Sequence, residues 1–233
     1  MFARREALAL AADGGASSRG LTMATIVVTR PAGREHALVE ALRRAGYEPV
    51  HIPLVAIEAL GDEPVDVGAY DWVVLTSAVG ARELRRRMRG TPGHVAAIGN
   101  ATARAYGAVD LVAPVSTQEG LLSVLPADPG RVLFAGAEGA RRVLPDALGA
   151  DVVALYRTVP LVPAEWPRAD LVVLTSASAA SAYATLGRMI PAVSIGPQTT
   201  RAAVGSGIAV LAEAATPDVD GLVAAVRQAL GTS

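Results

Sequence analysis

The chain of 233 residues has no cysteine, only three histidines and few aromatic side chains. Without cysteine it can form no disulfide, no thiolate nucleophile and no cysteine-based metal site, and this composition fits a reducing cytoplasm. The histidines, at positions 36, 51 and 94, show no ligand spacing, so we expect no metal. Because 4% of the residues are aromatic and 52% are hydrophobic, the core must be packed with alanine, valine and leucine.

Long apolar runs and an excess of one charge are also missing. The longest stretch without a charged residue, Leu171–Gly187, contains several serines and threonines. It falls short of the ~20 mostly apolar residues that a membrane span requires. The net charge is −1, so no strong field favours nucleic acid or an anionic membrane. We therefore expect a soluble protein that binds neither nucleic acid nor a membrane.

The first 22 residues differ in composition from the rest of the chain. A six-residue apolar run, Ala7–Ala12, follows Arg4, Arg5 and Glu6 and precedes a stretch rich in glycine and serine. The run is too short for a signal peptide. We expect residues 1–22 to form a flexible leader.

One sequence unit occurs twice, first at Asp71–Leu125 and again at Asp170–Val226. Each copy opens with an aspartate and an apolar run that ends in Leu-Thr-Ser, and continues to an Ile-Gly pair and a later threonine. The two copies are 99 residues apart at the Leu-Thr-Ser triplets, 97 at the Ile-Gly pairs, and 99 at Thr117 and Thr216. A period this long predicts two similar half-molecules rather than a solenoid.

Each copy predicts strands alternating with helices. The short runs Trp72–Leu75 and Leu171–Leu174 are typical of strands buried on both faces. The Thr-Ser pairs that follow suit helix N-caps, and a threonine is expected to open the last helix of each unit. This alternation indicates an α/β fold with parallel sheets, which bind ligands beyond the carboxyl ends of their strands. The candidate binding residues at these ends are Thr76, Ser77, Gly99, Ser176 and Gly196.

A second element also recurs, but not in tandem with the first. A strand, a glycine-containing turn, a helix and an extended stretch begin at Thr25 and again at Arg131. Gly33 in the first turn matches Gly139 in the second, 106 positions later, and Gly136 is expected in the same second turn. We therefore predict two doubly wound parallel-sheet domains of the flavodoxin-like type. Residues 24–53 and 162–233 form the first domain, and residues 62–151 form the second. Segments 54–61 and 152–161 form a two-stranded β connector, with the ligand cleft between the domains.

The order and spacing of these segments resemble the uroporphyrinogen-III synthase family over roughly Ile26–Leu230. The matching segments are Val28-Thr-Arg-Pro-Ala-Gly33, Leu75-Thr-Ser77, Ile98-Gly-x-x-Thr102, Tyr156-Arg-Thr158, Leu174-Thr-Ser176 and Ile195-Gly-Pro-x-Thr199. The resemblance implies a cofactor-free reaction of tetrapyrrole biosynthesis in which linear hydroxymethylbilane loses water and closes with inversion of ring D. It also implies two α/β domains with the site in the cleft. We expect a cytoplasmic monomer.

The substrate implied by this resemblance carries eight carboxylates, so the site must supply many hydrogen-bond donors. Backbone N–H groups at helix starts are ready anion sites, and Arg30 and Arg157 stand near such starts. Each arginine could equally be a solvated surface residue. Tyr156, in the predicted connector, is the candidate proton donor, mostly on the resemblance; a half-buried strand tyrosine is the alternative.

Thr102 and Thr199 occupy the same place in the two copies, which makes them candidate catalytic donors to the substrate or helix caps. Ser77 and Ser176 suit caps better than nucleophiles, because neither lies in a Gly-x-Ser-x-Gly motif. A nucleotide-binding oxidoreductase would need Gly-x-Gly-x-x-Gly, and the nearest stretch, Phe134–Gly139, lacks the first glycine. A non-catalytic, two-domain small-molecule-binding or regulatory protein with the same fold stays open as the alternative.

Overall fold

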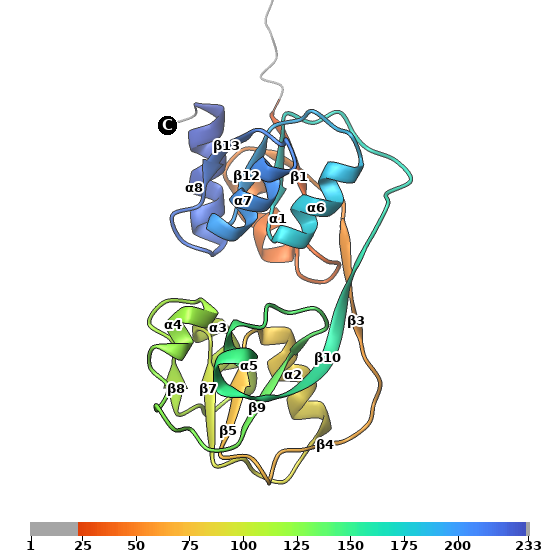
Figure 1. Ribbon diagram of the computed structural model, residues 1–233. Coiled ribbons are helices and arrows are strands. Elements are labelled where there is room, and N and C mark those ends of the chain that lie inside the picture. Colours follow the sequence, from red (N-terminus) through yellow and green to blue (C-terminus); the bar gives the residue numbers. More distant parts are fainter. Residues whose placement is uncertain (1–22, 232–233) are drawn as a thin grey trace, which may run out of the picture.

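The computed structural model describes residues 23–231 and shows two parallel β-sheets, each flanked by helices (Figure 1). The expected leader at residues 1–22 lies outside the described residues. In the view of Figure 1 the five-stranded sheet lies above the six-stranded sheet, and β3 and β10 run between them along one side. No helix among residues 23–231 is long and apolar enough to cross a membrane.

The five-stranded sheet has the strand order β13-β12-β11-β1-β2, and all its neighbouring strands are parallel. Its strands are β1 (Thr25–Val28), β2 (Glu48–His51), β11 (Leu171–Leu174), β12 (Ala192–Ser194) and β13 (Val210–Glu213). Helices α1 (His36–Arg44) and α8 (Val219–Leu230) pack on one apolar core cluster of this sheet. Helices α6 (Ala177–Thr185) and α7 (Pro197–Gly205) pack on another. The buried alanines of α6 let that helix lie close to the strands.

The six-stranded sheet has the order β3-β10-β9-β5-β7-β8 and is parallel except for the antiparallel pair β3–β10. Its strands are β3 (Val55–Ala59), β5 (Trp72–Leu75), β7 (His94–Ala97), β8 (Leu111–Val112), β9 (Val132–Ala137) and β10 (Asp151–Pro160). Helices α2 (Ala78–Arg87) and α3 (Asn100–Tyr106) share one core cluster, and α4 (Gln118–Leu122) and α5 (Val143–Leu148) share the other. A short pair joins β4 (Val65–Asp66) to β6 (Met88–Arg89).

The strand registers reproduce both sequence repeats. Trp72 lies opposite Val132 in the six-stranded sheet, and Leu171 lies opposite Ile26 in the five-stranded sheet. Leu171 follows Trp72 by 99 positions, whereas Val132 follows Ile26 by 106 positions. Strands β5, β7, β8, β9 and β10 therefore correspond in order to β11, β12, β13, β1 and β2. The duplication predicted from the sequence is confirmed, with the strands of one copy drawn from both ends of the chain.

The aspartates that open the two repeat units make the same structural contact. The Asp71 carboxylate accepts a hydrogen bond from the backbone N–H of Arg131 at 2.7 Å, and the Asp170 carboxylate accepts one from Thr25 at 2.8 Å. Arg131 and Thr25 immediately precede or begin the strand beside each aspartate. Each carboxylate thus satisfies a backbone donor at the sheet edge opposite the carboxyl ends of the strands.

Serine caps begin the helices that follow the two Thr-Ser pairs, as predicted. Ser77 Oγ accepts from the Gly80 N–H at 2.9 Å, and Ser176 Oγ accepts from the Ala179 N–H at 3.1 Å. Thr117 caps α4 in the same way. The prediction that Thr216 opens the corresponding helix is wrong, because Asp218 caps α8 and Thr216 donates to its carboxylate. A carboxylate is the stronger acceptor for helix N–H groups.

Three further expectations need correction. Gly136 was expected in a turn but lies inside β9, which continues to Ala137 because its backbone pairs with Ala154 of β10. Thr102 and Thr199 do not cap helices, because they lie inside α3 and α7. The N-caps there are Gly99 and Gly196, which have no side chain to accept a hydrogen bond.

Candidate active site

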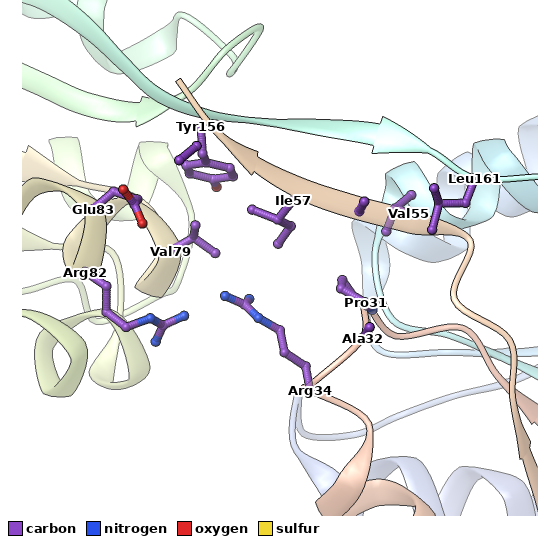
Figure 2. A pocket seen from close by; sticks show the side chains of 12 residues that line it. Pro31, Ala32, Arg34, Val55, Ile57, Val79, Arg82, Glu83, Tyr156 and Leu161 are labelled. Atoms are coloured by element: carbon purple, nitrogen blue, oxygen red, sulfur yellow. The ribbon is translucent and has the colours of Figure 1, made fainter. Parts of the chain in front are cut away.

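Two adjoining cavities, of about 400 and about 350 Å³, lie where the two sheets face each other beside β3 and β10 (Figure 2). Residues from three sources line both of them: the turn after β1, the helix after β5, and the strands β3 and β10. The shared lining residues are Pro31, Arg34, Val55, Ile57, Val79 and Tyr156. The cavities therefore form one cleft at the carboxyl ends of β1, β5 and β11, the place that the parallel strands predict.

Tyr156 and Ser77 form a hydroxyl pair in this cleft. The Tyr156 hydroxyl donates to Ser77 Oγ at 2.9 Å, and the side chain of Tyr156 is buried. Ser77 Oγ also accepts the capping hydrogen bond from Gly80. Both lone pairs of the serine oxygen are therefore occupied, and its own O–H is left to donate. The pair presents a neutral hydrogen-bond donor, held by a helix start on one side and a strand on the other.

Three arginines give the cleft a positive charge. Arg30 lines the second cavity, Arg82 the first, and Arg34 both. Within residues 23–231 no carboxylate lies within 4 Å of these three guanidinium groups. Burial, followed by the neighbouring charge of Arg82, lowers the pKa of Arg34, while Tyr156 acts in the opposite direction. Burial and the charge of Arg34 lower the pKa of Arg30. Arginine still stays protonated under these conditions, so the cleft suits anions.

The wall formed by the five-stranded sheet is polar but uncharged. Thr175, Ser176 and Ser178 line the second cavity after β11. Ser176 Oγ caps α6 and shares a 3.1 Å hydrogen bond with Ser178 Oγ. These hydroxyls can donate to a ligand or accept from it, and they leave the positive charge of the cleft to the arginines.

The structure brings some of the sequence-predicted site residues together and leaves others apart. Those that line the cleft are Arg30, Ser77, Tyr156 and Ser176. Those absent from the lining of both cavities are Gly33, Thr76, Gly99, Thr102, Gly136, Arg157, Gly196 and Thr199. Thr102 and Thr199 are each 4% exposed, which leaves little of either side chain for a substrate to reach. Roles for the residues in this second group stay predictions.

Arg157 shows why sequence proximity to Tyr156 is a poor guide. Consecutive residues of a strand face opposite sides of the sheet, so Arg157 faces away from the side that Tyr156 occupies. It lies opposite Glu58 in the β3–β10 register and forms an ion pair with it, Nη2 to Oε2, at 2.8 Å. Its guanidinium already has a carboxylate partner.

Several lining residues were not singled out from the sequence, chiefly Ile57, Val79, Arg82, Glu83 and Ser178. A local signal existed for Arg82. It lies three residues after Val79 on α2, and residues at this spacing share a helix face. Once the Thr-Ser pair is placed at the cleft, this face of α2 is placed there too. Among residues 23–231 no group of three or more histidine, aspartate or glutamate side chains could hold a metal ion.

Comparison with known proteins places this geometry in a family. The family model described as "Uroporphyrinogen-III synthase HemD" matches residues 36–224, a range that includes Ser77, Arg82 and Tyr156. A Methanocaldococcus jannaschii protein named "Putative uroporphyrinogen-III synthase" is 26% identical over 147 residues, which cover 57% of this chain and 61% of that protein. The chain thus spans about three fifths of the length of this relative.

A solved structure has the same fold. It is a mutant uroporphyrinogen-III synthase from the extremely thermophilic bacterium Thermus thermophilus, with a TM-score of 0.63 and 17% sequence identity. The match covers 90% of this chain and all of that one. At this identity the likeness bears on the fold alone. Because the family model covers well over half of the chain, the protein belongs to the uroporphyrinogen-III synthase family.

Proposed function

We propose that this protein cyclises hydroxymethylbilane to uroporphyrinogen III, with loss of water and inversion of ring D. It would be a cyclising lyase of tetrapyrrole biosynthesis. The observation that carries the proposal is the composition of the cleft in a chain of this family. A hydroxyl pair, Tyr156 and Ser77, lies beside three arginines that have no carboxylate partner among the described residues.

We also propose that the two sheets belong to separate, flavodoxin-like domains, made of residues 24–53 with 162–233 and of residues 62–151. Segments 54–61 and 152–161 would connect them. Support comes from the strand order, which repeats between the sheets, and from the two core clusters that each sheet has of its own. Two crossings allow a hinge, so the cleft could open for the substrate and close around it.

Charge complementarity supports the substrate class. The bilane carries eight carboxylates, and Arg30, Arg34 and Arg82 offer planar donors that match carboxylate geometry. Helices α2 and α6 each begin with a capping serine that lines the cleft, so the positive ends of both helix dipoles face the cleft. Since these donors are spread around the cleft, they would hold an extended polyanion better than a small one.

The hydroxyl pair fits the first chemical step. The departing hydroxyl of the bilane leaves as water once it gains a proton, while the adjacent pyrrole nitrogen supplies most of the electron push. A neutral donor such as the Ser77 O–H, positioned by Tyr156, can polarise that hydroxyl. A neutral hydroxyl is a weak acid, so the assistance that this pair gives is modest.

The test is to incubate the protein with hydroxymethylbilane made in situ, oxidise the products and separate the porphyrin isomers by chromatography. Without an enzyme the bilane closes to the type I isomer. We expect the type III fraction to rise with protein concentration, and heat-denatured protein serves as the control. A product that stays type I at high protein concentration would contradict the proposal and favour a binding or regulatory role. A cytoplasmic monomer without a cofactor stays part of the proposal, and light scattering after size-exclusion chromatography tests the monomer.

A further inference from the structure

Arg34 and Arg82 approach the cleft from opposite sides. Arg34 stands in the turn between β1 and α1, beside the five-stranded sheet, and Arg82 stands on α2, beside the six-stranded sheet. Figure 2 shows their guanidinium groups pointing toward one another across the first cavity. Burial, and after it the charge of Arg82, lowers the pKa of Arg34.

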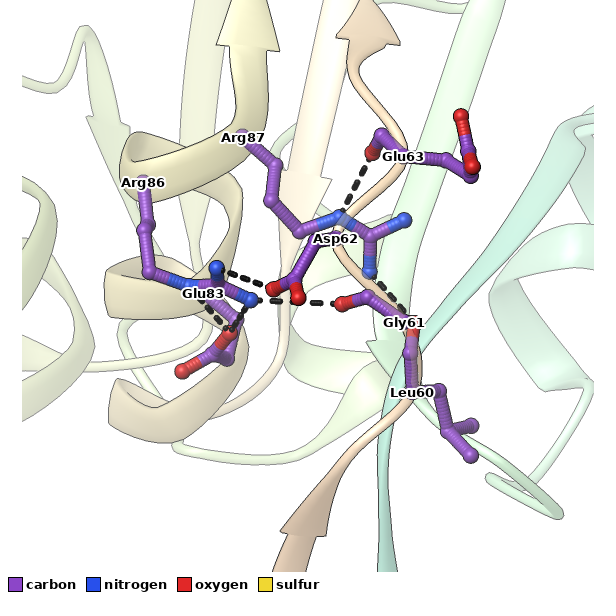
Figure 3. Close-up of polar contacts among 7 residues, drawn as sticks. All are labelled: Leu60, Gly61, Asp62, Glu63, Glu83, Arg86 and Arg87. Atoms are coloured by element: carbon purple, nitrogen blue, oxygen red, sulfur yellow. Dashed lines mark hydrogen bonds and ion pairs between the residues drawn. The ribbon is translucent and has the colours of Figure 1, made fainter.

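The carboxylate that lines this cavity is already engaged. Glu83 lines the same cavity as Arg82, but its Oε2 is 2.9 Å from Nη2 of Arg86. Arg86 in turn bonds to Asp62, Nη1 to Oδ1, at 2.5 Å (Figure 3). Glu83 is thus paired with Arg86, and among residues 23–231 no ion pair joins it to Arg82. The described residues therefore supply no carboxylate to the two facing cations.

Helix α2 is also fixed to the segment that follows β3. Arg87 is 9% exposed and donates to the backbone carbonyls of Leu60 and Glu63, each at 2.8 Å (Figure 3). Arg82 is thereby held with one wall of the cleft, whereas Arg34 belongs to the other wall. Both arginines are solvent-exposed, yet like charges that face one another still repel, and an anion between them removes that cost.

We propose that Arg34 and Arg82 bind one carboxylate of the substrate jointly, as a clamp that draws the two walls of the cleft together. This inference rests on the proposed function and adds how binding is coupled to closure. A ligand group that touches both walls binds the closed cleft better than the open one, and this difference shifts the population toward closure. Two guanidinium groups can meet the two oxygens of one carboxylate with charge-assisted hydrogen bonds.

A double-mutant cycle tests the clamp. The variants are Arg34→Ala, Arg82→Ala and the double variant, with Arg43→Ala as the matched control. Arg43 is an exposed α1 cation paired with Glu40 outside the cleft. Each cleft variant should raise KM for hydroxymethylbilane roughly 10- to 100-fold, the value of a hydrogen bond to a charged group. If both arginines hold one carboxylate, the KM of the double variant should be at most about threefold higher than that of the single variant with the higher KM. Effects that multiply, or single variants with unchanged KM, would overturn the clamp.

A binding measurement separates failure of the clamp from failure of the proposed function. Uroporphyrin III, a fluorescent octacarboxylate, is titrated into each variant, and small-angle scattering records the radius of gyration with and without it. We expect compaction of the wild type and of Arg43→Ala, and none in either cleft variant. If uroporphyrin III binds with non-additive losses of affinity across the cycle but no type III product forms, the proposed function is wrong and the clamp stands. If type III product forms but the losses in the cycle are additive, only the clamp is wrong. The absence of both turnover and binding would contradict both proposals.

Charge reversal gives an independent variant. Arg82→Glu would place a carboxylate on α2 opposite Arg34, so the ligand-free protein should become more compact and bind uroporphyrin III more weakly than Arg82→Ala does. Circular dichroism confirms that each variant keeps its fold. A charge-reversed protein that stays as open as the wild type would show that Arg34 and Arg82 do not meet across the cleft.

Discussion

The two copies of the strand, Thr-Ser and helix unit share a backbone but carry different chemistry. Helix α2 presents Arg82, Arg85, Arg86 and Arg87, whereas the positions 99 residues later in and just after α6 are occupied by serine, alanine, threonine and leucine. Both helices begin with a capping serine at the same cleft. The duplicated backbone fixes where the site lies, and the side chains that differ between the copies decide its charge. Of the α2 arginines only Arg82 lines the cleft, opposite Arg30 and Arg34 from the turn after β1.

The hydroxyl groups differ between the copies as well. Ser77 receives a hydrogen bond from Tyr156, whereas Ser176 shares one with Ser178 of its own helix. Tyr156 lies where β10 pairs with both neighbouring strands, opposite Ala137 at the end of β9 and opposite Ala59 of β3. The equivalent strand of the other copy, β2, is only four residues long. The longer strand β10 thus carries the tyrosine that completes the hydroxyl pair, and the shorter β2 of the other copy has no equivalent of it.

The largest expected effect comes from making α2 resemble α6 at its C-terminal end. Arg87→Leu installs the residue found at the equivalent position 186 and leaves the carbonyls of Leu60 and Glu63 without the donors of two part-buried hydrogen bonds. We expect the free energy of unfolding to fall by about 1.5–3 kcal/mol, the contribution of hydrogen bonds from a charged donor. Urea denaturation measures this, with Arg85→Leu as the control, because Arg85 is on the same helix and donates one exposed hydrogen bond to the Tyr106 carbonyl. A loss similar to that of the control would mean that water replaces the arginine.

The next effect concerns the tyrosine of the longer strand β10. Tyr156→Phe removes the hydroxyl that bonds to Ser77 but keeps the ring. We expect a normal fold, continued type III product, and a kcat/KM for hydroxymethylbilane roughly 10- to 100-fold lower, at or below the low end of general-acid contributions. A loss under about twofold would assign the tyrosine to packing. A switch to type I product would instead place the phenol at the ring-inversion step.

The two capping serines offer a paired comparison of smaller size. Ser77→Ala and Ser176→Ala each remove one N-cap, so each should cost about 1 kcal/mol of stability. Activity should fall further for Ser77→Ala, because that variant also strips the hydroxyl that Tyr156 positions. Thermal melting and steady-state kinetics on both variants measure the two effects. Equal losses of activity would show that the copies contribute equally to the site.

The smallest effect is a pH dependence in the last helix of each copy. The Gly221 N–H, and then Thr216, lower the pKa of the Asp218 carboxyl that caps α8, whereas α4 has a neutral threonine cap. A carboxyl whose folded pKa is depressed stabilises the fold above its unfolded pKa of about 3.9 and loses this contribution as pH falls through the folded value. Asp218→Ser should therefore reduce the loss of stability between about pH 5 and pH 2. Urea midpoints across this range measure it, and a pH dependence identical to that of the wild type would show that protonation of Asp218 contributes nothing to the acid loss.

Much of the fold could be predicted because its signals are local. Apolar runs of four residues, capping serines and constant offsets between copies depend on neighbouring residues and on counting. The capping prediction failed at Thr216, where a carboxylate two residues later takes the cap. It also failed at Thr102 and Thr199, which are the third residues of their helices. Gly136 was misplaced because β10 extends the pairing of β9 beyond the point where the sequence suggests a turn.

The sequence by itself determined the class of fold, the duplication and the presence of Ser77, Ser176, Arg30 and Tyr156 at the cleft. The tertiary structure alone decided which cations are paired. Arg157 meets Glu58, 99 positions away, because β3 and β10 are antiparallel in one register, while Arg34 and Arg82 face each other across the cleft. Hydrophobic periodicity reports which face of an element is buried. It carries no information on which distant side chain lies opposite, because that is fixed by the packing of elements far apart in the chain.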